Sequence, residues 1–443
     1  MSRLFGTDGI RGIANLDLKP TLAYSLGRAT AHLLAAGRDP IVLGQDTRRS
    51  GDMLSCAVVA GATSMGVDVH RAGVLPTPAL AFLAGSGDFA AGIVVSASHN
   101  PADDNGLKVL DRRGLKLDDA LEEELDALIW RADELAGPTN AGLGREVDAR
   151  ALVSRYVAHR THLAERNRND LRVVLDCANG SGSEVAPVLL AASGARVEVV
   201  FDRPDGANIN LRCGATPPEA LAARVAELGA DLGIALDGDG DRCVAVDERG
   251  EVVDGDRLIG IIALDRLARG ALAERTVVVS VLSNGGLAAA VERRDGRIVR
   301  TPVGDKYILD AMLVSGAGLG GEKSGHVIVI EHSTSGDGIV TALEVLGILA
   351  RQGRRLSELA AEIPLLPQLQ RTVRVRHKDE WSADPALAEA VAAAERELEG
   401  HGRLLVRPSG TEPALRVMVE GDDPARVAAL ADALAALAAE RLN

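Results

Sequence analysis

Short apolar runs alternate along this chain with longer segments in which apolar residues recur at helical spacing. Residues 41–44 and 93–95 are rich in Val, Ile and Leu, the composition that predicts buried strands. Residues 21–36 and 51–64 place their apolar positions on one helix face, which predicts amphipathic helices. Strands that alternate with helices in this way are typical of βαβ units, in which the sheet is mainly parallel.

This order of elements occurs three times, and each time it ends in a polar loop. The loops are Ser-Ala-Ser-His-Asn-Pro at residues 96–101, Asp-Gly-Asp-Gly-Asp-Arg at 237–242, and Gly-Glu-Lys-Ser-Gly-His at 321–326. Further strands are expected at residues 67–69, 172–175, 195–201, 231–236, 276–281 and 297–300. The repetition predicts three similar α/β domains, each of which delivers one polar loop from the end of a strand.

After residue 366 the pattern changes to that of a smaller domain. Strands are expected there at residues 370–375, 403–406 and 414–420, and helices at 385–397 and 424–441. The fold class predicted is α/β: three similar α/β domains with mixed, mainly parallel sheets, plus a smaller α+β C-terminal domain, around a central cleft. The domain boundaries expected are 1–148, 149–252, 253–366 and 367–443, with a hinge at the Pro-containing stretch 363–367.

Composition restricts the class of protein further. The 443 residues are 47% hydrophobic and 25% charged, as in globular proteins, and the net charge of −14 speaks against nucleic acid as a partner. The four cysteines have no paired spacing, which indicates buried thiols in a reducing compartment. No apolar run reaches spanning length, and the first residues show no apolar signal region. We therefore expect a cytoplasmic monomer or homodimer without a membrane partner.

Asp237, Asp239 and Asp241 alternate with glycines, which let the backbone fold so that three carboxylates converge. Three like charges repel unless a cation neutralises them, and carboxylate oxygens favour Mg²⁺ or Mn²⁺ over Zn²⁺. A calcium EF-hand loop is excluded, because Arg242 stands where that loop needs glycine and a strand follows at once. A solvated acidic turn is the alternative interpretation.

Ser98 lies in a turn directly after a predicted strand, where open α/β sheets bind ligands. Its hydroxyl is a candidate nucleophile, and the alternative is a serine that only hydrogen-bonds its own turn. Lys108 follows ten residues later, and a returning strand would bring its ammonium group near Ser98. A solvated surface lysine is the alternative there. The glycine-rich loop at residues 5–12 carries one cation, Arg11, and is by itself no more than a turn signal.

A turn in the C-terminal domain suits a phosphate dianion. Arg407, Ser409, Gly410 and Thr411 combine a guanidinium, two hydroxyls and a glycine amide, and Arg416 follows in the next expected strand. An ordinary hairpin turn is the alternative.

Glu322, Ser324 and His326 alternate along what we expect to be an extended segment, so that an acceptor, a hydroxyl and an imidazole face one side. Such a set suits sugar hydroxyls, although a polar turn is the commoner explanation. Together with the candidate nucleophile, the carboxylates and the phosphate turn, it indicates phosphoryl transfer to and from a phosphorylated sugar. The P-loop and kinase motifs are absent from the sequence, so we expect the phosphoryl group to reside on the enzyme.

In these four motifs and their order, the chain resembles the α-D-phosphohexomutase superfamily over its full length. Residues 5–12 and 334–338 are similar to those of bacterial members that act on glucosamine phosphates. The resemblance implies an isomerase that converts glucosamine 6-phosphate to glucosamine 1-phosphate through a phosphoserine and glucosamine 1,6-bisphosphate, toward UDP-N-acetylglucosamine and cell-wall precursors. A phosphomannomutase/phosphoglucomutase and a non-catalytic sugar-phosphate-binding protein stay open as alternatives.

The resemblance also implies roles for individual residues. Phosphorylated Ser98 and three aspartates would hold one Mg²⁺ per chain: Asp237, Asp239 and Asp241. The residues implied in catalysis are Ser98, Lys108, Arg11 and His326, with Arg242 stabilising charge in transfer. The residues implied in substrate binding are Glu322, Ser324, Arg407, Ser409, Gly410, Thr411 and Arg416. Glucosamine or glucose 1,6-bisphosphate is the expected activator.

Overall fold

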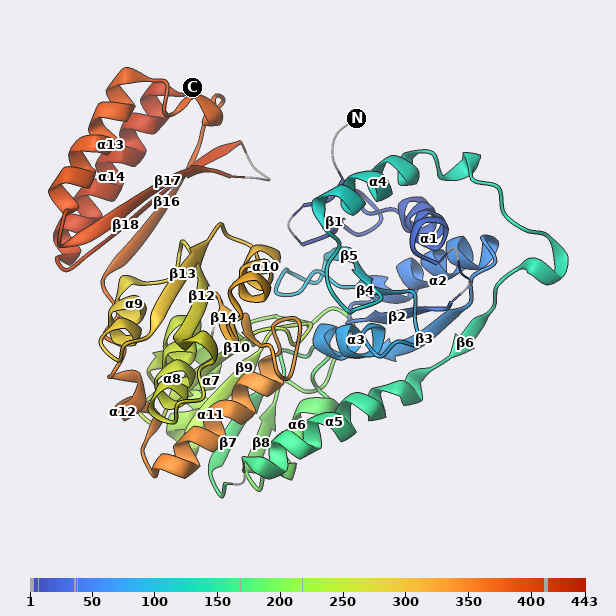
Figure 1. Ribbon diagram of the computed structural model, residues 1–443, viewed down its shortest axis with the longest axis horizontal. Coiled ribbons are helices and arrows are strands. Elements are labelled where there is room, and N and C mark those ends of the chain that lie inside the picture. The colour runs from blue at the N-terminus through green and yellow to red at the C-terminus, as the bar shows by residue number, and fades with distance from the viewer. Residues whose placement is uncertain are drawn as a thin grey trace. The chain divides into compact units, whose positions relative to one another are not determined.

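The chain packs as two units in the computed structural model, which describes residues 4–6, 8–35, 37, 39–167, 169–216, 218–409 and 413–443. The larger unit is made of Met1–Leu282 and Arg294–Glu362, and the smaller one of Ser283–Arg293 and Ile363–Asn443. The described residues form three sheets in the larger unit and one in the smaller unit (Figure 1). The four domain boundaries and the hinge expected from the sequence stay predictions.

The first sheet contains the strand that leads into the Ser98 loop. Its strands, in spatial order, are β1 (Ile10–Ile13), β5 (Asp104–Asp111), β4 (Ala91–Val95), β2 (Ile41–Gln45), β3 (Val69–Val74) and β6 (Glu146–Asp148). β4, β2, β3 and β6 are parallel, whereas β5 runs antiparallel to β4 and β1. Its helices are α1 (Pro20–Leu34), α2 (Ser50–Ser64), α3 (Thr77–Ala84) and α4 (Asp119–Trp130). Every residue of β4 is buried, as expected of a central strand covered on both faces.

The second sheet leads into the Asp loop, residues 237–242. Its strands, in spatial order, are β11 (Val252–Val253), β10 (Cys243–Asp247), β9 (Leu232–Leu236), β7 (Arg172–Asp176) and β8 (Arg196–Val200). Its helices are α5 (Val153–Arg166), α6 (Val185–Ala192) and α7 (Glu219–Leu228). β9, β7 and β8 are parallel, and β10 returns antiparallel from the Asp loop.

The third sheet leads into the loop that contains Glu322 and His326. Its strands, in spatial order, are β13 (Arg297–Thr301), β12 (Thr276–Ser280), β14 (Leu319–Gly321) and β15 (Val327–Val329). The helices around it in the sequence are α8 (Gly255–Ala268), α9 (Gly285–Glu292), α10 (Asp305–Ser315), α11 (Gly338–Gln352) and α12 (Leu356–Ala360). β13, β12 and β14 are parallel, and β15 is antiparallel.

The smaller unit has an antiparallel sheet with two long helices. The sheet order is β16 (Gln368–Arg374), β18 (Ala414–Gly421) and β17 (Gly402–Pro408), with helices α13 (Pro385–Leu398) and α14 (Pro424–Arg441). A short 3₁₀ helix occupies Lys378–Glu380 in this unit, and others occupy Ala132–Glu134, Asn140–Gly142, Arg150–Leu152 and Ala273–Arg275 in the larger unit. The predicted fold class, α/β with mixed sheets and a smaller α+β domain, is confirmed.

One expected strand is misplaced. The sequence predicted a strand at residues 67–69, but β3 begins at Val69 and continues to Val74. Met65 and Gly66 end α2 in a turn, in which Gly66 has a φ of +84°. Residues 67–68 connect that turn to the sheet. The hydrogen-bonded strand therefore begins two residues after the start of the apolar run at residues 67–69.

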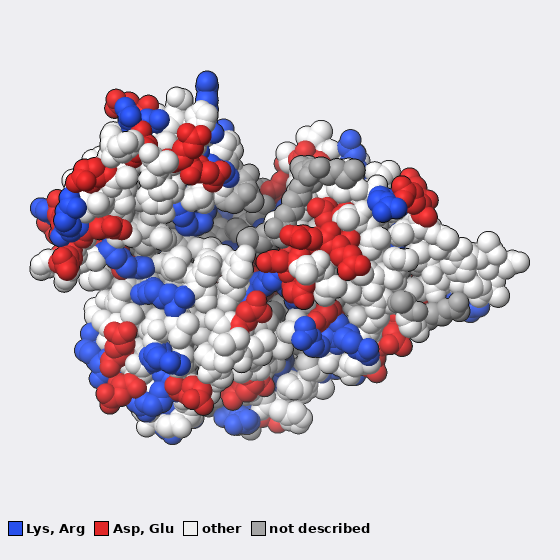
Figure 2. Space-filling model, turned by 45° about the horizontal axis from the view of Figure 1, so that its top comes forward, with Lys and Arg blue, Asp and Glu red and all other residues white. Residues whose placement is uncertain are grey.

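On the face of the molecule drawn in Figure 2, acidic side chains gather in one patch near the middle, and side chains of both signs are interspersed elsewhere. With a net charge of −14, the overall field of the protein would not attract an anionic ligand, so such a ligand would need locally placed donors. Among the described residues, no helix is both long and apolar enough to cross a membrane.

The contact between α1 and α2 gives a test of the packing. A Cβ on Gly61 would lie 2.1 Å from the carbonyl oxygen of Tyr24, and one on Gly27 would lie 2.3 Å from that of Val58. We expect Gly61→Ala to lower the free energy of unfolding by about 1–3 kcal/mol, because the helices must separate. Thermal melting checks this, with Gly37→Ala as control, since a Cβ there meets nothing within 4 Å. Equal melting temperatures for the two variants would contradict it.

Candidate active site

The Ser98 loop projects from the carboxyl end of β4, in the middle of the first sheet. Ser98 is 1% exposed and has a φ of +52°, a left-handed conformation that is costly for a residue with a Cβ. Its hydroxyl donates to Asp237 Oδ2 at 2.6 Å, which joins the first polar loop to the second. The strained backbone therefore points this hydroxyl at a carboxylate of another sheet.

Three buried residues hold the Ser98 loop in this conformation. The Ser98 N–H donates to Ser96 Oγ at 2.9 Å, and Ser96 Oγ donates to Asp46 Oδ2 at 2.6 Å. Arg48 Nη2 donates to the carbonyl oxygens of Ser98 (2.9 Å) and Asn100 (2.8 Å), while its Nε donates to Asp46 at 2.9 Å. Burial raises the pKa of Asp46, against the opposing charge of Arg48. The planar guanidinium of Arg48 thus holds the Ser98 loop through several hydrogen bonds at once; this set of contacts is called the Arg48 fork.

The three aspartates of the Asp loop converge between β9 and β10. Carboxylate oxygens of Asp237, Asp239 and Asp241 lie within 4.8 Å of one another, and all three residues are buried. Lys108 lies opposite Val94 in the β4–β5 pairing, and its Nζ is 2.8 Å from Asp239 Oδ2. The returning strand expected from the sequence therefore carries this ammonium group to the Asp loop.

This carboxylate group has the properties of a cation site. Asp239 Oδ1 and Asp241 Oδ1 are buried and accept no hydrogen bond from any described residue. Burial, followed by the charges of Asp241 and Asp239, raises the pKa of Asp237 well above its usual range. A hard divalent cation would satisfy both unpaired oxygens and remove the repulsion. The donor set, three carboxylates in a closed site, fits Mg²⁺ or Mn²⁺.

Glu322, Ser324 and His326 do not alternate along an extended segment, and that prediction is wrong. The loop is a hairpin turn between β14 and β15, in which the Gly325 N–H donates to the Glu322 carbonyl at 3.0 Å. Gly325 takes a φ of +93°, which closes the turn. Ser324 Oγ is buried and has no hydrogen-bond partner in the described structure, and burial raises the pKa of Glu322.

His326 connects the third polar loop to the Asp loop. Burial lowers the pKa of His326, but a hydrogen bond to Asp241 and the charges of Asp241, Asp305 and Glu322 outweigh it and raise that pKa to about 9. Against this, the Gly336 N–H donates to Nε2 at 2.9 Å, and a protonated Nε2 cannot accept it. A proton on Nδ1, which faces Asp241 Oδ2 at 3.5 Å, is therefore the arrangement that leaves Nε2 able to accept this hydrogen bond.

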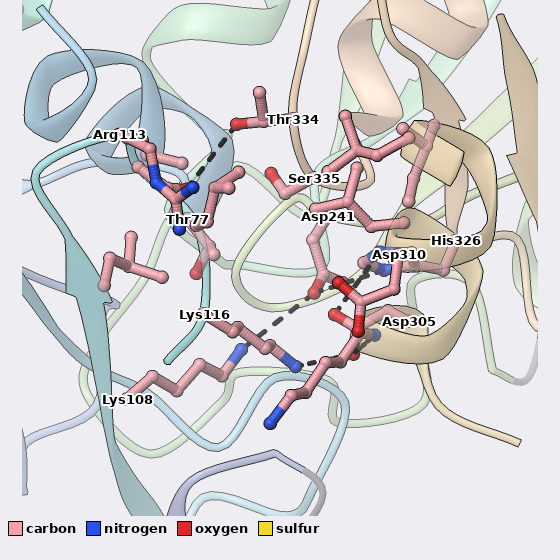
Figure 3. A pocket seen from close by; sticks show the side chains of 18 of the residues that line it. Thr77, Lys108, Arg113, Lys116, Asp241, Asp305, Asp310, His326, Thr334 and Ser335 are labelled. Carbon is pink, nitrogen blue, oxygen red and sulfur yellow. Dashed lines mark hydrogen bonds and ion pairs between the residues drawn. The ribbon is translucent and has the colours of Figure 1, made fainter. Parts of the chain in front are cut away.

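A cavity of about 130 Å³ lies beside this site, between the first and third sheets. Figure 3 shows the ammonium groups of Lys108 and Lys116 pointing toward Asp241 and Asp305. Lys116 Nζ lies 2.7 Å from Asp305 and 2.8 Å from Asp8, so it ties the N-terminal loop to α10. The charged side chains that line this cavity can hydrogen-bond a polar ligand next to the Asp loop.

Both predicted arginines of the larger unit lie among these acids. Arg242 donates its backbone N–H to Asp237 Oδ1 at 3.2 Å, and its buried Nε has no hydrogen-bond partner among the described residues. Arg11 lies 3.2 Å from Asp8. Contacts and charge interactions of the larger unit bring together Arg11, Ser98, Lys108, Asp237, Asp239, Asp241, Arg242, Glu322 and His326, and Ser324 lies in the turn between Glu322 and His326.

The remaining predicted residues belong to the smaller unit. Arg407 of β17 and Arg416 of β18 are directly paired across the antiparallel ladder. The Ser409 N–H donates to the Ala414 carbonyl at 2.8 Å, so Ser409 lies at the base of the hairpin. Gly410 and Thr411 lie outside the described residues.

The chain matches four family models in order. They are described as phosphoglucomutase/phosphomannomutase alpha/beta/alpha domain I (residues 2–136), domain II (154–250), domain III (254–365) and C-terminal domain (372–437). Its sequence is 51% identical over 426 residues to a protein of Moorella thermoacetica named phosphoglucosamine mutase, covering 96% of both chains. A Symbiobacterium thermophilum protein of that name is 49% identical over 442 residues, with 98% of both chains covered. The chain belongs to the phosphoglucosamine mutase family.

Solved structures agree with the fold. A Burkholderia thailandensis phosphoglucomutase/phosphomannomutase family protein superposes with a TM-score of 0.83 at 27% identity, over 100% of this chain and 98% of that one. N-acetylphosphoglucosamine mutase of Aspergillus fumigatus, solved with GlcNAc-6P and magnesium, has a TM-score of 0.71 at 20% identity, over 99% and 96% of the two chains. The latter likeness shows the fold alone. The superfamily recognised from the four motifs is confirmed.

The sequence interpretation missed the residues that support the site in this phosphoglucosamine mutase family member. Asp46 and Arg48 follow β2, and Thr77 begins α3 and donates to Asp239 Oδ2 at 2.7 Å. Asn210 donates its Nδ2 to the Ser98 carbonyl at 2.9 Å. Asp46 and Arg48 could have been found from the sequence, because they lie in a polar loop directly after a predicted strand. That strand, β2, is the parallel neighbour of β4, so its loop lies at the same edge of the sheet.

Arg48 gives a test of this support. Arg48→Met should lower the free energy of unfolding of the larger unit by about 3–5 kcal/mol, because Asp46 would stay buried without its ion-pair partner. The amides of residues 98–104 should also exchange faster with solvent. Chemical unfolding and hydrogen exchange check this against Arg49→Met, whose side chain is exposed. The same stability and exchange in both variants would show that the fork is dispensable.

Proposed function

We propose that this protein interconverts glucosamine 6-phosphate and glucosamine 1-phosphate, the activity for which its close relatives are named. The observation that carries the proposal is the 2.6 Å hydrogen bond from Ser98 to Asp237, which places a strained, buried hydroxyl beside three carboxylates. That arrangement suits a covalent phosphoserine next to a cation. The relatives at about half identity over almost the whole chain support the choice of hexosamine phosphate as substrate.

Ser98 is the proposed carrier of the phosphoryl group. Phosphoserine transfers its phosphoryl to O1 of glucosamine 6-phosphate: the bond from phosphorus to Ser98 Oγ breaks, and one to O1 forms. The bisphosphate then turns over, its 6-phosphoryl passes to Ser98 Oγ, and glucosamine 1-phosphate leaves. In the first transfer the base takes the O1 proton, and Oγ leaves with a proton from Asp237 Oδ2, the carboxylate oxygen that it faces. In the second transfer Oγ returns that proton to Asp237 Oδ2, and the base protonates the departing O6. Glucosamine or glucose 1,6-bisphosphate is the proposed activator, because either can phosphorylate Ser98.

The sugar hydroxyl must also lose its proton, and Lys108 is the better placed of the two proposed bases. His326 accepts from Gly336 at Nε2 and faces Asp241 with Nδ1, so neither nitrogen is open to a substrate. Burial lowers the pKa of Lys108, but the charges of Asp239 and Asp241 outweigh it and raise that pKa. When a cation neutralises those carboxylates, the effect of burial remains, and the amine can release its proton.

Asp237, Asp239, Asp241 and phosphorylated Ser98 are the proposed ligands of one Mg²⁺. The unpaired oxygens of Asp239 and Asp241 support this assignment. A bound Mg²⁺ supplies Lewis-acid neutralisation of the phosphoryl oxygens during transfer. Arg242, whose buried Nε has no hydrogen-bond partner among the described residues, is the proposed second source of positive charge. Arg11 is proposed to steady the phosphoserine.

Substrate binding is assigned to two groups of residues. Glu322 and Ser324 are proposed to bind the sugar hydroxyls, and the unpartnered Ser324 Oγ supports this. The phosphate that does not react is proposed to bind Arg407, Ser409, Gly410, Thr411 and Arg416. A cytoplasmic location and a monomeric or homodimeric state are part of the same proposal.

Turnover of glucosamine 6-phosphate with a trace of glucose 1,6-bisphosphate tests the substrate. The family models name phosphoglucomutase and phosphomannomutase, so glucose and mannose phosphates are the second candidates. We expect the highest kcat/KM with the glucosamine phosphate. A higher value with either other sugar would replace the proposed substrate.

Ser98→Ala tests the covalent step. It should lower turnover by at least about 10²-fold, since a covalent nucleophile is lost. After incubation with glucose 1,6-bisphosphate, the wild-type protein should gain the mass of one phosphoryl group and Ser98→Ala should not. Ser86→Ala, a serine of a surface turn, is the control and should behave like wild type. Phosphorylation of Ser98→Ala to the same extent would place the acceptor elsewhere.

Asp239→Asn tests the cation site. It removes one of three carboxylates, so Mn²⁺ binding followed by electron paramagnetic resonance should weaken more than about 10-fold, and turnover should fall with it. The control is Asp231→Asn, a carboxylate outside the Asp loop, which should bind the ion as wild type does. Excess chelator should abolish wild-type turnover. Activity that survives both chelator and Asp239→Asn would show that the carboxylates are structural only.

A further inference from the structure

A buried side-chain cluster lies next to the candidate active site without belonging to it. Tyr156 and Arg160 are one turn apart on α5, and Asp337 immediately precedes α11; each is at most 1% exposed. The Tyr156 hydroxyl donates to Asp337 Oδ2 at 2.9 Å, and Arg160 Nη2 lies 3.2 Å from the same oxygen. The Val340 N–H donates to Asp337 Oδ1 at 3.0 Å, so this carboxylate also caps α11. These three residues are called the Asp337 cluster below.

The Asp337 cluster joins three helices that are far apart in the sequence. The Arg160 guanidinium lies 4.8 Å from the centre of the Tyr156 ring and 5.7 Å from that of Phe82, which belongs to α3. α5 therefore contacts both α3 and α11 in this part of the larger unit. A buried ion pair adds little net stability compared with apolar residues, and its best-attested use is to specify one geometry. The contacts made by the neighbours of Asp337 indicate which geometry the cluster specifies.

The two glycines that flank Asp337 contact the candidate active site through their backbone N–H groups. On one side, the Gly336 N–H donates to His326 Nε2 at 2.9 Å. On the other, the Gly338 N–H donates at 3.0 Å to the carbonyl oxygen of Gly240, which lies between two aspartates of the Asp loop. A Cβ at Gly338 would lie 2.3 Å from the Arg242 carbonyl oxygen, so this backbone packs directly against the Asp loop.

We propose that the Asp337 cluster is a positioning device for the active site. Fixing the Asp337 carboxylate at the start of α11 holds the neighbouring N–H groups of Gly336 and Gly338, which orient the His326 ring, with Nε2 as acceptor, and the backbone of the Asp loop. Tyr156 is a positioning residue in this scheme, because it reaches the site only through Asp337. The inference depends on the proposed function only where turnover is measured.

Tyr156→Phe is the test, because it removes one hydroxyl and keeps the ring over Arg160. We expect kcat to fall about 10-fold or more, as for outer residues that orient metal ligands, while KM for glucosamine 6-phosphate stays the same. Tyr24→Phe is the matched control, since that hydroxyl contacts Arg28 Nη1 at 3.3 Å in a different part of the larger unit. A kcat and KM for Tyr156→Phe equal to those of Tyr24→Phe would overturn the proposal.

A second measurement does not depend on activity. In Mg²⁺-loaded protein, the imidazole ¹⁵N shifts of His326, identified by their loss in His326→Gln, should report a proton on Nδ1 in wild type and Tyr24→Phe. In Tyr156→Phe they should report a mixture of tautomers, and an unchanged tautomer would overturn the proposal. If wild type does not convert glucosamine 6-phosphate, the proposed function fails, but this comparison still decides the positioning role.

A second variant guards against failure to fold. Arg160→Met with Asp337→Asn removes both buried charges together, so neither is left unpaired, and asparagine still caps a helix. The proposal expects this double variant to be folded by circular dichroism but to show the mixed tautomer and the lowered kcat. Wild-type values for both would mean that the cluster serves stability alone.

Discussion

Repulsion among three buried carboxylates is the constraint on which the rest of the larger unit depends. Asp237, Asp239 and Asp241 place oxygens within 4.8 Å of one another in a region closed to water, where charges interact more strongly than at the surface. The groups around them are correspondingly donors or cations: the Ser98 and Thr77 hydroxyls, Lys108, His326 and Arg242. They come from two other sheets as well as from the Asp loop itself. The three sheets of the larger unit are thus joined at one point by hydrogen bonds and ion pairs to these carboxylates.

The need to bring donors to the three carboxylates explains why many of the contacts to them come from the ends of strands. Parallel strands present their carboxyl ends at one edge of a sheet, so β4, β9 and β14 each release a polar loop there. The return strands β5, β10 and β15 are antiparallel in all three sheets, and β5 brings Lys108 back to the site. The same local topology therefore supplies the proposed nucleophile, the carboxylates and the imidazole. Asp239 Oδ1 and Asp241 Oδ1 accept no hydrogen bond from the described residues, and this is why a cation is proposed there.

The sequence predicted those features that local chemistry determines. Strand, glycine spacing and charge are local, so the Ser98 loop, the convergence of the aspartates and the return of Lys108 could be stated in advance. The turn at residues 322–326 was misinterpreted, because alternate polar residues also occur in a hairpin closed by a glycine of positive φ. Tyr156 and Asp337 lie 181 residues apart in the sequence and carry no mutual pattern. Only the packing of α5 against α11 shows that they meet.

The rigidity of the Ser98 loop restricts how the proposed reaction can proceed. Ser98 is held by Ser96 at its N–H and by Arg48 and Asn210 at its carbonyl, and these contacts favour its left-handed backbone. In the proposed mechanism the phosphoserine keeps this backbone in both transfers. Since both phosphoryl groups must reach the same Oγ, the bisphosphate has to turn relative to it. The binding site must therefore accept the bisphosphate in either orientation. This requirement follows from the contacts of buried Arg48 that hold Ser98, as well as from the two phosphate positions of the sugar.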